Sequence, residues 1–160
     1  MDPGAARGGQ VIRDRKLAGV LRTLRELPGQ QLFKYRDQDG EWREVESADV
    51  NAYIREALGE DFSAKDFRTW AGTVSAARAL REMEPPTSAT AAKGCVRLCV
   101  KAVSGLLGNT PTVCRASYVH PAVFEAFEDG SLFALPHADA KGFDTALIRM
   151  LENREAARAA

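Results

Sequence analysis

The chain has 160 residues, no net formal charge and an apolar fraction of 45%, which is enough for a packed core and excludes a disordered polypeptide. It contains no run of about 18 apolar residues and no signal-peptide pattern, so we expect neither a membrane span nor secretion. The three cysteines, Cys95, Cys99 and Cys114, lack a disulfide or zinc spacing, which predicts a reducing, cytoplasmic setting and small core residues.

Residues 1–10 are rich in Gly and Ala and show no periodicity, so we predict a disordered arm followed by one domain over residues 11–160. The pair Asp39-Gly40 lies between two short runs that contain aromatic residues, which is typical of a β-hairpin turn. Little else in the sequence indicates strands. The pattern therefore predicts a mainly α fold with at most a small β-hairpin.

Apolar residues at intervals of three and four predict seven helices. They span 14–27, 48–58, 64–83, 89–107 and 139–158, with two short ones within 110–118 and 120–130. Ser47 is the expected cap of the second helix, and Gly59 is expected to end it. The fourth helix carries six residues on its predicted apolar face, namely Val96, Cys99, Val100, Val103, Leu106 and Leu107.

Residues 85–124 contain no acidic side chain. Within them Lys93, Arg97 and Lys101 recur every four residues, so they form one stripe along a helix, and Arg115 follows. A basic surface without acids suits a phosphate backbone and predicts salt-dependent DNA binding. A solvated helix face would show the same pattern, so charge alone leaves both interpretations open.

The stretch "SAKDFRTWAG" places Lys65 and Arg68 in the first two turns of a predicted helix. Cations are unfavourable at a helix start unless an anion binds there, because that end of the helix dipole is positive. The pair therefore indicates a phosphate site, although an ordinary surface pair is the alternative. Phe67 and Trp70 are expected to hold the helix in the core.

Two strings, "KDFRTWAGT" and "LGNTPTVCRASYVHP", together resemble the catalytic domain of type IB DNA topoisomerases, in the bacterial branch related to the poxvirus enzymes. The strings "LPGQQLFKYRDQDG" and "SADVNAYIREALGEDFSAKDFRTWAGT" also resemble that branch, so the resemblance covers about residues 11–130. Tyrosine recombinases share this catalytic architecture and are a more distant resemblance. The resemblance implies a multi-helix fragment of the topoisomerase IB and tyrosine recombinase type.

The resemblance also implies a mechanism. Tyr118 would attack a phosphodiester of double-stranded DNA, form a 3′-phosphotyrosyl link and release a 5′-hydroxyl strand, which later reseals the break and leaves the DNA relaxed. Arg68 would bind the scissile phosphate, Lys65 would contact DNA or the same phosphate, and Asn109 would donate a hydrogen bond to a phosphate oxygen. Bond energy is conserved, so the resemblance implies neither ATP, nor a metal, nor any other cofactor.

Two further residues that the resemblance implies have no counterpart in this sequence. They are an upstream Arg and a general-acid Lys on a β-hairpin in a "GKxG"-like string. The N-terminal DNA-clamping domain has no counterpart either. We therefore expect an N-terminally truncated or split monomer that is weak or inactive alone, unless a separate chain carries the N-terminal part.

Alternatives remain open at this point. A non-catalytic DNA-binding remnant would use Lys93, Arg97 and Lys101 without a covalent step, and a purely structural helical domain is a further alternative. A tyrosine recombinase would favour an "HxxR" string at residues 65–68, where this chain has "KDFR". For His120 we favour capping of the next helix over proton transfer. Arg115 is interpreted as a DNA or structural contact.

Overall fold

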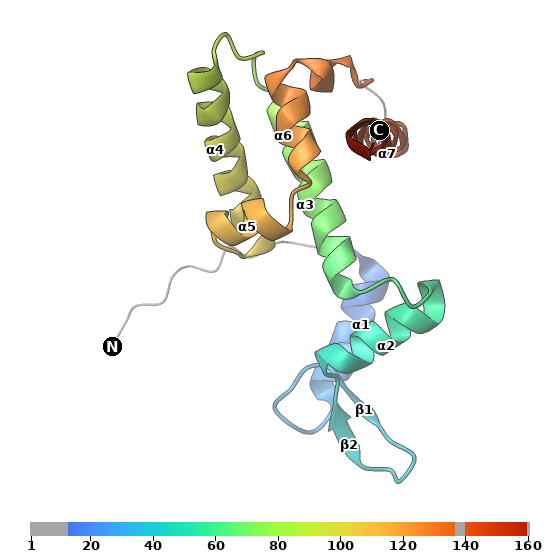
Figure 1. The fold of residues 1–160 in the computed structure, drawn as a ribbon. Helices are drawn as coiled ribbons and strands as arrows, with labels where there is room; N and C mark the ends of the chain where they lie inside the picture. The colour runs from blue at the N-terminus through green and yellow to red at the C-terminus, as the bar shows by residue number, and fades with distance from the viewer. Residues whose placement is uncertain (1–12, 137–139, 160) are drawn as a thin grey trace, which may run out of the picture. The chain divides into compact units, whose positions relative to one another are not determined.

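The computed structural model describes residues 13–136 and 140–159, and the chain divides into two compact units that meet in sequence between Ala64 and Lys65. The predicted arm over residues 1–10 lies outside the described residues. Within the described chain, seven α-helices, one 3-10 helix and one two-stranded antiparallel sheet are present (Figure 1). The prediction of a mainly α fold with a small hairpin is confirmed.

The unit that ends at Ala64 contains two helices and the hairpin. Its elements are α1 (Arg15–Glu26), β1 (Lys34–Arg36), β2 (Trp42–Glu44) and α2 (Ser47–Leu58). The Asp14 carboxylate caps α1 by accepting from the backbone N–H groups of Lys16 and Leu17 at 2.8 and 2.9 Å. That bond satisfies donors that the first turn of a helix leaves free.

The hairpin forms around the Asp39-Gly40 turn, as predicted. Gly40 has φ +82°, in the left-handed region that favours glycine. The Asp37 carboxylate accepts from the backbone N–H groups of Asp39 and Glu41 and from Arg43 Nε. The Arg43 hydrogen bond is the main cause that lowers the pKa of Asp37 below 3.8. Local hydrogen bonds therefore hold this turn.

The start of α2 differs from the prediction. Ser47 is the first helical residue and not the cap, and Glu46 takes the cap position. The Asp49 carboxylate accepts from the Glu46 backbone N–H at 2.8 Å, which is the reciprocal arrangement of a capping box. Gly59 ends the helix as predicted, with φ +109°.

The unit that starts at Lys65 carries the remaining elements. They are α3 (Ala64–Arg81), α4 (Ala89–Leu107), α5 (Pro111–Ser117), α6 (Pro121–Glu128), the 3-10 helix η1 (Ser131–Ala134) and α7 (Ala140–Ala159). Ser88 caps α4 and Thr110 caps α5 through their side-chain oxygens. Gly108 ends α4 in the left-handed conformation, so the chain turns sharply into α5. No helix of the described residues is long and apolar enough to cross a membrane.

The buried apolar cluster of the described chain lies in this second unit, where α4 packs against α5 and α6 (Figure 1). Its largest fully buried side chains include Leu80, Val96, Phe127, Leu132 and Leu147. Two cysteines, Cys99 and Cys114, are buried in it as predicted. Burial, with a smaller contribution from Cys114, raises the pKa of the Cys99 thiol to about 12. Cys99 is thus a neutral core residue at physiological pH.

Two predicted core residues are exposed. Phe67 is 54% exposed and Leu106 is 45% exposed. On an α-helix, where successive residues are about 100° apart, Phe67 lies opposite the buried residues Ala76 and Leu80 of α3. Leu106 lies at the edge of the buried face of α4. The apolar side chains predicted burial, but the angular positions of these residues on their helices leave them exposed.

Candidate functional site

Arg68 and Tyr118 lie together although 50 residues separate them in sequence. The Arg68 guanidinium lies over the Tyr118 ring, with its carbon 5.1 Å from the ring centre. Arg68 Nη2 also donates to the main-chain oxygen of Leu107 at 2.8 Å. A planar guanidinium that stacks on a ring and donates to a carbonyl has a defined orientation. Arg68 has five N–H donors in all, so it can still bind a phosphate.

Asn109 joins the same neighbourhood. Its Nδ2 donates to the Leu107 oxygen at 3.4 Å, so one carbonyl accepts from both Arg68 and Asn109. The Gly108 turn makes this possible, because it ends α4 directly after Leu107 and reverses the chain. Arg68, Asn109 and Tyr118, three of the four predicted catalytic residues, are thus brought together.

Lys65, the fourth predicted residue, lies on the first turn of α3 and is exposed. Its main-chain oxygen accepts from Thr69 Oγ1 at 2.9 Å, and the same hydroxyl lies 3.3 Å from the oxygen of Ser117, next to Tyr118. Lys65 and Arg68 are three positions apart, so they project from neighbouring positions on α3. Lys65 can therefore reach a ligand of Arg68 from the same helix.

The main chain around Tyr118 rests on α3 through residues that the sequence analysis did not single out. A Cβ atom on Gly72 would lie 2.2 Å from the main-chain oxygen of Tyr118. The buried Thr73 side chain accepts from the His120 backbone N–H at 3.1 Å. Thr69, Gly72 and Thr73, which we call the Tyr118 support, recur at helical spacing within "KDFRTWAGT". That spacing of small residues on one face was the available signal.

His120 has the capping role that the sequence predicted. Its Nδ1 accepts from the Ala122 backbone N–H at 3.3 Å at the start of α6. Its Nε2 lies 3.0 Å from a Glu155 carboxylate oxygen on α7. Because Nδ1 accepts, the proton of a neutral ring lies on Nε2 and faces Glu155. The His120 ring therefore connects the start of α6, just after Tyr118, to α7.

The predicted basic stripe is present on α4. Lys93, Arg97 and Lys101 are all exposed. By helical phase, Lys93 lies at the edge of the buried face of α4 and Lys101 lies farthest from that face. Arg115 is exposed on α5, and its guanidinium lies 5.0 Å from the centre of the Phe124 ring. Arg115 thus has a structural contact.

Comparison of the sequence with known proteins identifies its family. A family profile described as "Eukaryotic DNA topoisomerase I, catalytic core" matches residues 12–134. The chain belongs to this topoisomerase I family. A DNA topoisomerase 1B of Acanthamoeba polyphaga mimivirus is 30% identical to it, over 89% of this chain and 44% of the viral protein. The chain therefore spans less than half the length of this curated relative.

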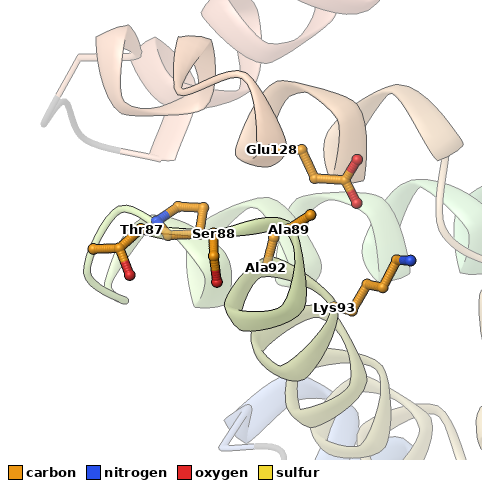
Figure 2. A pocket seen from close by; sticks show the side chains of 7 residues that line it. Thr87, Ser88, Ala89, Ala92, Lys93 and Glu128 are labelled. Carbon is orange, nitrogen blue, oxygen red and sulfur yellow. The ribbon is translucent and has the colours of Figure 1, made fainter.

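The topoisomerase I family match includes Lys65, Arg68, Asn109 and Tyr118, and it ends before α7. A pocket of about 300 Å³ lies elsewhere, at the start of α4 (Figure 2). Lys93 and the Glu128 carboxylate are among its lining residues, and the latter would disfavour a phosphate. The 19 residues of α4 span about 28 Å, so this pocket lies far from Leu107. It contains none of the four predicted catalytic residues.

Proposed function

We propose that this chain supplies the nucleophile end of a type IB topoisomerase site, with Tyr118 as the nucleophile. In the proposed step, Tyr118 Oη attacks the phosphorus of a DNA phosphodiester and a phosphotyrosyl bond forms at the 3′ end. The phenol releases its proton to solvent. The bond from phosphorus to the 5′ oxygen breaks, and that oxygen takes up a proton from solvent and leaves as a hydroxyl. The reverse attack reseals the strand after rotation.

The single observation that carries this proposal is the position of Arg68 between the Tyr118 ring and the Leu107 carbonyl. A phosphate beside the phenol would meet the free N–H groups of that guanidinium, which match two non-bridging oxygens. Such contacts stabilise the charge that develops on the phosphate by about 3–4 kcal/mol. Asn109 adds a neutral donor, and Lys65 adds a cation from the same helix.

The sequence stretch that contains Tyr118 favours a polyanion. No acidic residue occurs in residues 85–124, and Lys93, Arg97 and Lys101 form an exposed stripe about 12 Å long on α4. This length covers roughly three to four base steps of 3.4 Å. We propose that the stripe follows the backbone of double-stranded DNA, with Lys101 at the end that is nearer to Leu107.

We further propose that residues 1–160 act slowly by themselves, as a monomer. The upstream Arg and the general-acid Lys that the resemblance implies have no counterpart in this sequence. Loss of a general acid typically lowers a rate by about 10²–10⁴-fold. Supply of the missing Arg and Lys, on a longer form of this chain or on a separate polypeptide, would then restore the rate. We propose a cytoplasmic setting, close to the cell's DNA.

The test is a covalent adduct. The full chain is incubated with nicked or supercoiled DNA, the mixture is denatured, and protein bound to DNA is quantified. We expect an adduct that Tyr118→Phe abolishes. Tyr53→Phe is the matched control, because Tyr53 is 71% exposed and lies in the other unit. Absence of both adduct and relaxation with the wild-type chain would exclude the enzymatic proposal.

The basic stripe also supports a second candidate, a non-catalytic DNA-binding protein. Binding without an adduct would favour it. Replacing Lys93, Arg97 and Lys101 by Ala is expected to reduce the slope of log K against log salt by about 2.7, or 0.9 for each phosphate contact. The control, Arg149→Ala, removes an exposed cation of α7. A slope that is unchanged in the triple variant would exclude the stripe as the DNA surface.

A further inference from the structure

Gly72 has no room for a side chain. A Cβ at this position would lie 2.2 Å from the Tyr118 main-chain oxygen and 3.1 Å from a methyl carbon of Leu107. The first distance is shorter than any stable contact between carbon and oxygen, and its partner is backbone, which cannot rotate away. Gly72 is helical with an ordinary φ, so glycine is not required there by conformation. It is required because the Tyr118 backbone occupies the space.

Thr73 fixes the same segment by a second contact. Thr73 is 2% exposed, and its hydroxyl oxygen accepts from the His120 N–H at 3.1 Å. Thr69 adds a third contact, 3.3 Å from the Ser117 oxygen. The Tyr118 support therefore contacts the main chain before, at and after Tyr118. Because Ser117, Tyr118 and His120 are each contacted, the chain around Tyr118 cannot rotate about any single contact.

The same helix carries the predicted phosphate ligand. Arg68 lies four residues before Gly72, one turn earlier on α3 and on the same side of it. Any shift of the Tyr118 backbone relative to Gly72 therefore changes the distance between the phenol and the Arg68 guanidinium. The helix α3 therefore sets the positions of both the Tyr118 backbone and the Arg68 guanidinium. In-line attack on a bound phosphate needs such a fixed arrangement.

We infer that Gly72 and Thr73 are positioning residues that hold the Tyr118 backbone in register with Arg68. This inference rests on the proposed function for its catalytic consequence. It concerns residues that act through Tyr118 and do not touch the phosphate. Their loss should slow the covalent step while DNA affinity is kept, because the residues proposed to bind DNA are unchanged.

The first test compares two Gly-to-Ala changes in helices of the full chain. Gly72→Ala inserts a methyl group against Tyr118, whereas Gly105→Ala on α4 inserts one where nothing lies within 4 Å. The rate of adduct formation is measured at saturating DNA, together with the dissociation constant. We expect Gly72→Ala to slow the rate about 100-fold at unchanged affinity, since a displacement of about 1 Å can cost that much. Gly105→Ala should match the wild type.

The second test separates the Thr73 hydrogen bond from its volume. Thr73→Val keeps the shape and removes the acceptor for the His120 N–H, whereas Thr73→Ser keeps the acceptor. We expect Val to slow the covalent step at least tenfold and Ser to restore most of the rate. Equal rates for the two variants, or equal rates for Gly72→Ala and Gly105→Ala, would overturn the inference.

A third measurement is independent of catalysis. The Tyr118 ring signals are followed by aromatic NMR and assigned by their loss in Tyr118→Phe. We expect them to move in Gly72→Ala and Thr73→Val and to stay in Gly105→Ala and Thr73→Ser. If the wild type shows neither an adduct nor relaxation, the proposed function fails and this measurement alone decides. Ring signals that are unchanged in all four variants would then contradict the positioning role.

Discussion

The two units of this chain differ in how they use their apolar residues. From Lys65 onward, such residues form a buried cluster that includes Leu80, Phe127 and Leu147. Among the described residues up to Ala64, Lys34 is the only buried one. Its ammonium group donates to the main-chain oxygens of Leu27 and Gly29. Large apolar side chains such as Phe33 and Tyr53 are exposed there instead.

The difference shows where a precise site can be built. Arg68, Asn109 and Tyr118 all lie in the unit with the packed cluster, where neighbouring helices limit each side chain. The other unit is held by local contacts such as the Asp14 cap and the Asp37 turn. Short strands and two 12-residue helices bury little surface by themselves. The candidate site thus lies in the unit whose helices pack around a buried cluster.

The largest expected contrast is between a buried and an exposed phenylalanine. Phe127→Ala should lower the free energy of unfolding by about 3–5 kcal/mol, because it leaves a cavity. Phe33→Ala, at a side chain that is 56% exposed, should change it by less than about 0.5 kcal/mol. Denaturant unfolding is followed by Trp70 fluorescence in a Trp42→Phe background, since Trp70 packs against the buried cluster. Similar losses for both variants would contradict the contrast.

A smaller contrast is expected between two helix caps. Thr110→Ala removes the acceptor for the Val113 backbone N–H at the start of α5. It should lower the free energy of unfolding that Trp70 fluorescence reports by about 1 kcal/mol. Asp14→Ala removes the cap of α1. It should increase amide hydrogen exchange in α1 and leave the Trp70 transition unchanged. A shift of that transition in Asp14→Ala would show that the two units unfold together.

The smallest expected effect concerns pH. Burial alone would raise the pKa of Asp129, but hydrogen bonds from Ser131 and Arg154 outweigh it and lower the pKa from 3.8 to about 2. The folded state therefore binds this proton less readily than the unfolded state. Its stabilisation is present above about pH 4 and is lost as the pH falls towards 2.

Because the Asp129 side chain is half exposed, the effect should stay below about 1 kcal/mol. Denaturant unfolding at pH 5 and pH 2.5 should show a smaller difference for Asp129→Asn than for the wild type. Asp37→Asn serves as the comparison, since it removes a carboxylate of lowered pKa from the hairpin. It should leave the Trp70 transition unaffected. Identical pH dependence in Asp129→Asn and the wild type would refute the assignment.

Periodicity and turn residues predicted most of the secondary structure. The helix over 89–107 and the Asp39-Gly40 turn appear where the sequence placed them, because both depend on local chemistry. The prediction of Ser47 as the cap of α2 was wrong, since Glu46 and Asp49 form a capping box that places the cap one residue earlier. The burial of Phe67 was wrong for another reason: helical phase, and not residue type, sets which side of α3 is buried.

The candidate site was predictable as a set of residue types but not as a geometry. The resemblance named Lys65, Arg68, Asn109 and Tyr118, and their catalytic roles stay predictions. It gave no indication that a main-chain oxygen at Leu107 would receive both Arg68 and Asn109. Contacts between segments 39 residues apart depend on how helices pack, and a backbone acceptor leaves no mark in a sequence.

The Leu107 oxygen has a consequence for mutational tolerance. Because Arg68 is oriented by a main-chain atom, no substitution at position 107 can delete its acceptor. A saturation scan should therefore accept several apolar residues at Leu107, where only the fit of the side chain is at risk, and reject nearly all at Arg68. The stringent position beside Leu107 should be Gly108, whose left-handed backbone directs the chain away from the helix end. Genetic variation would thus accumulate at one residue of the site and be excluded at its immediate neighbour.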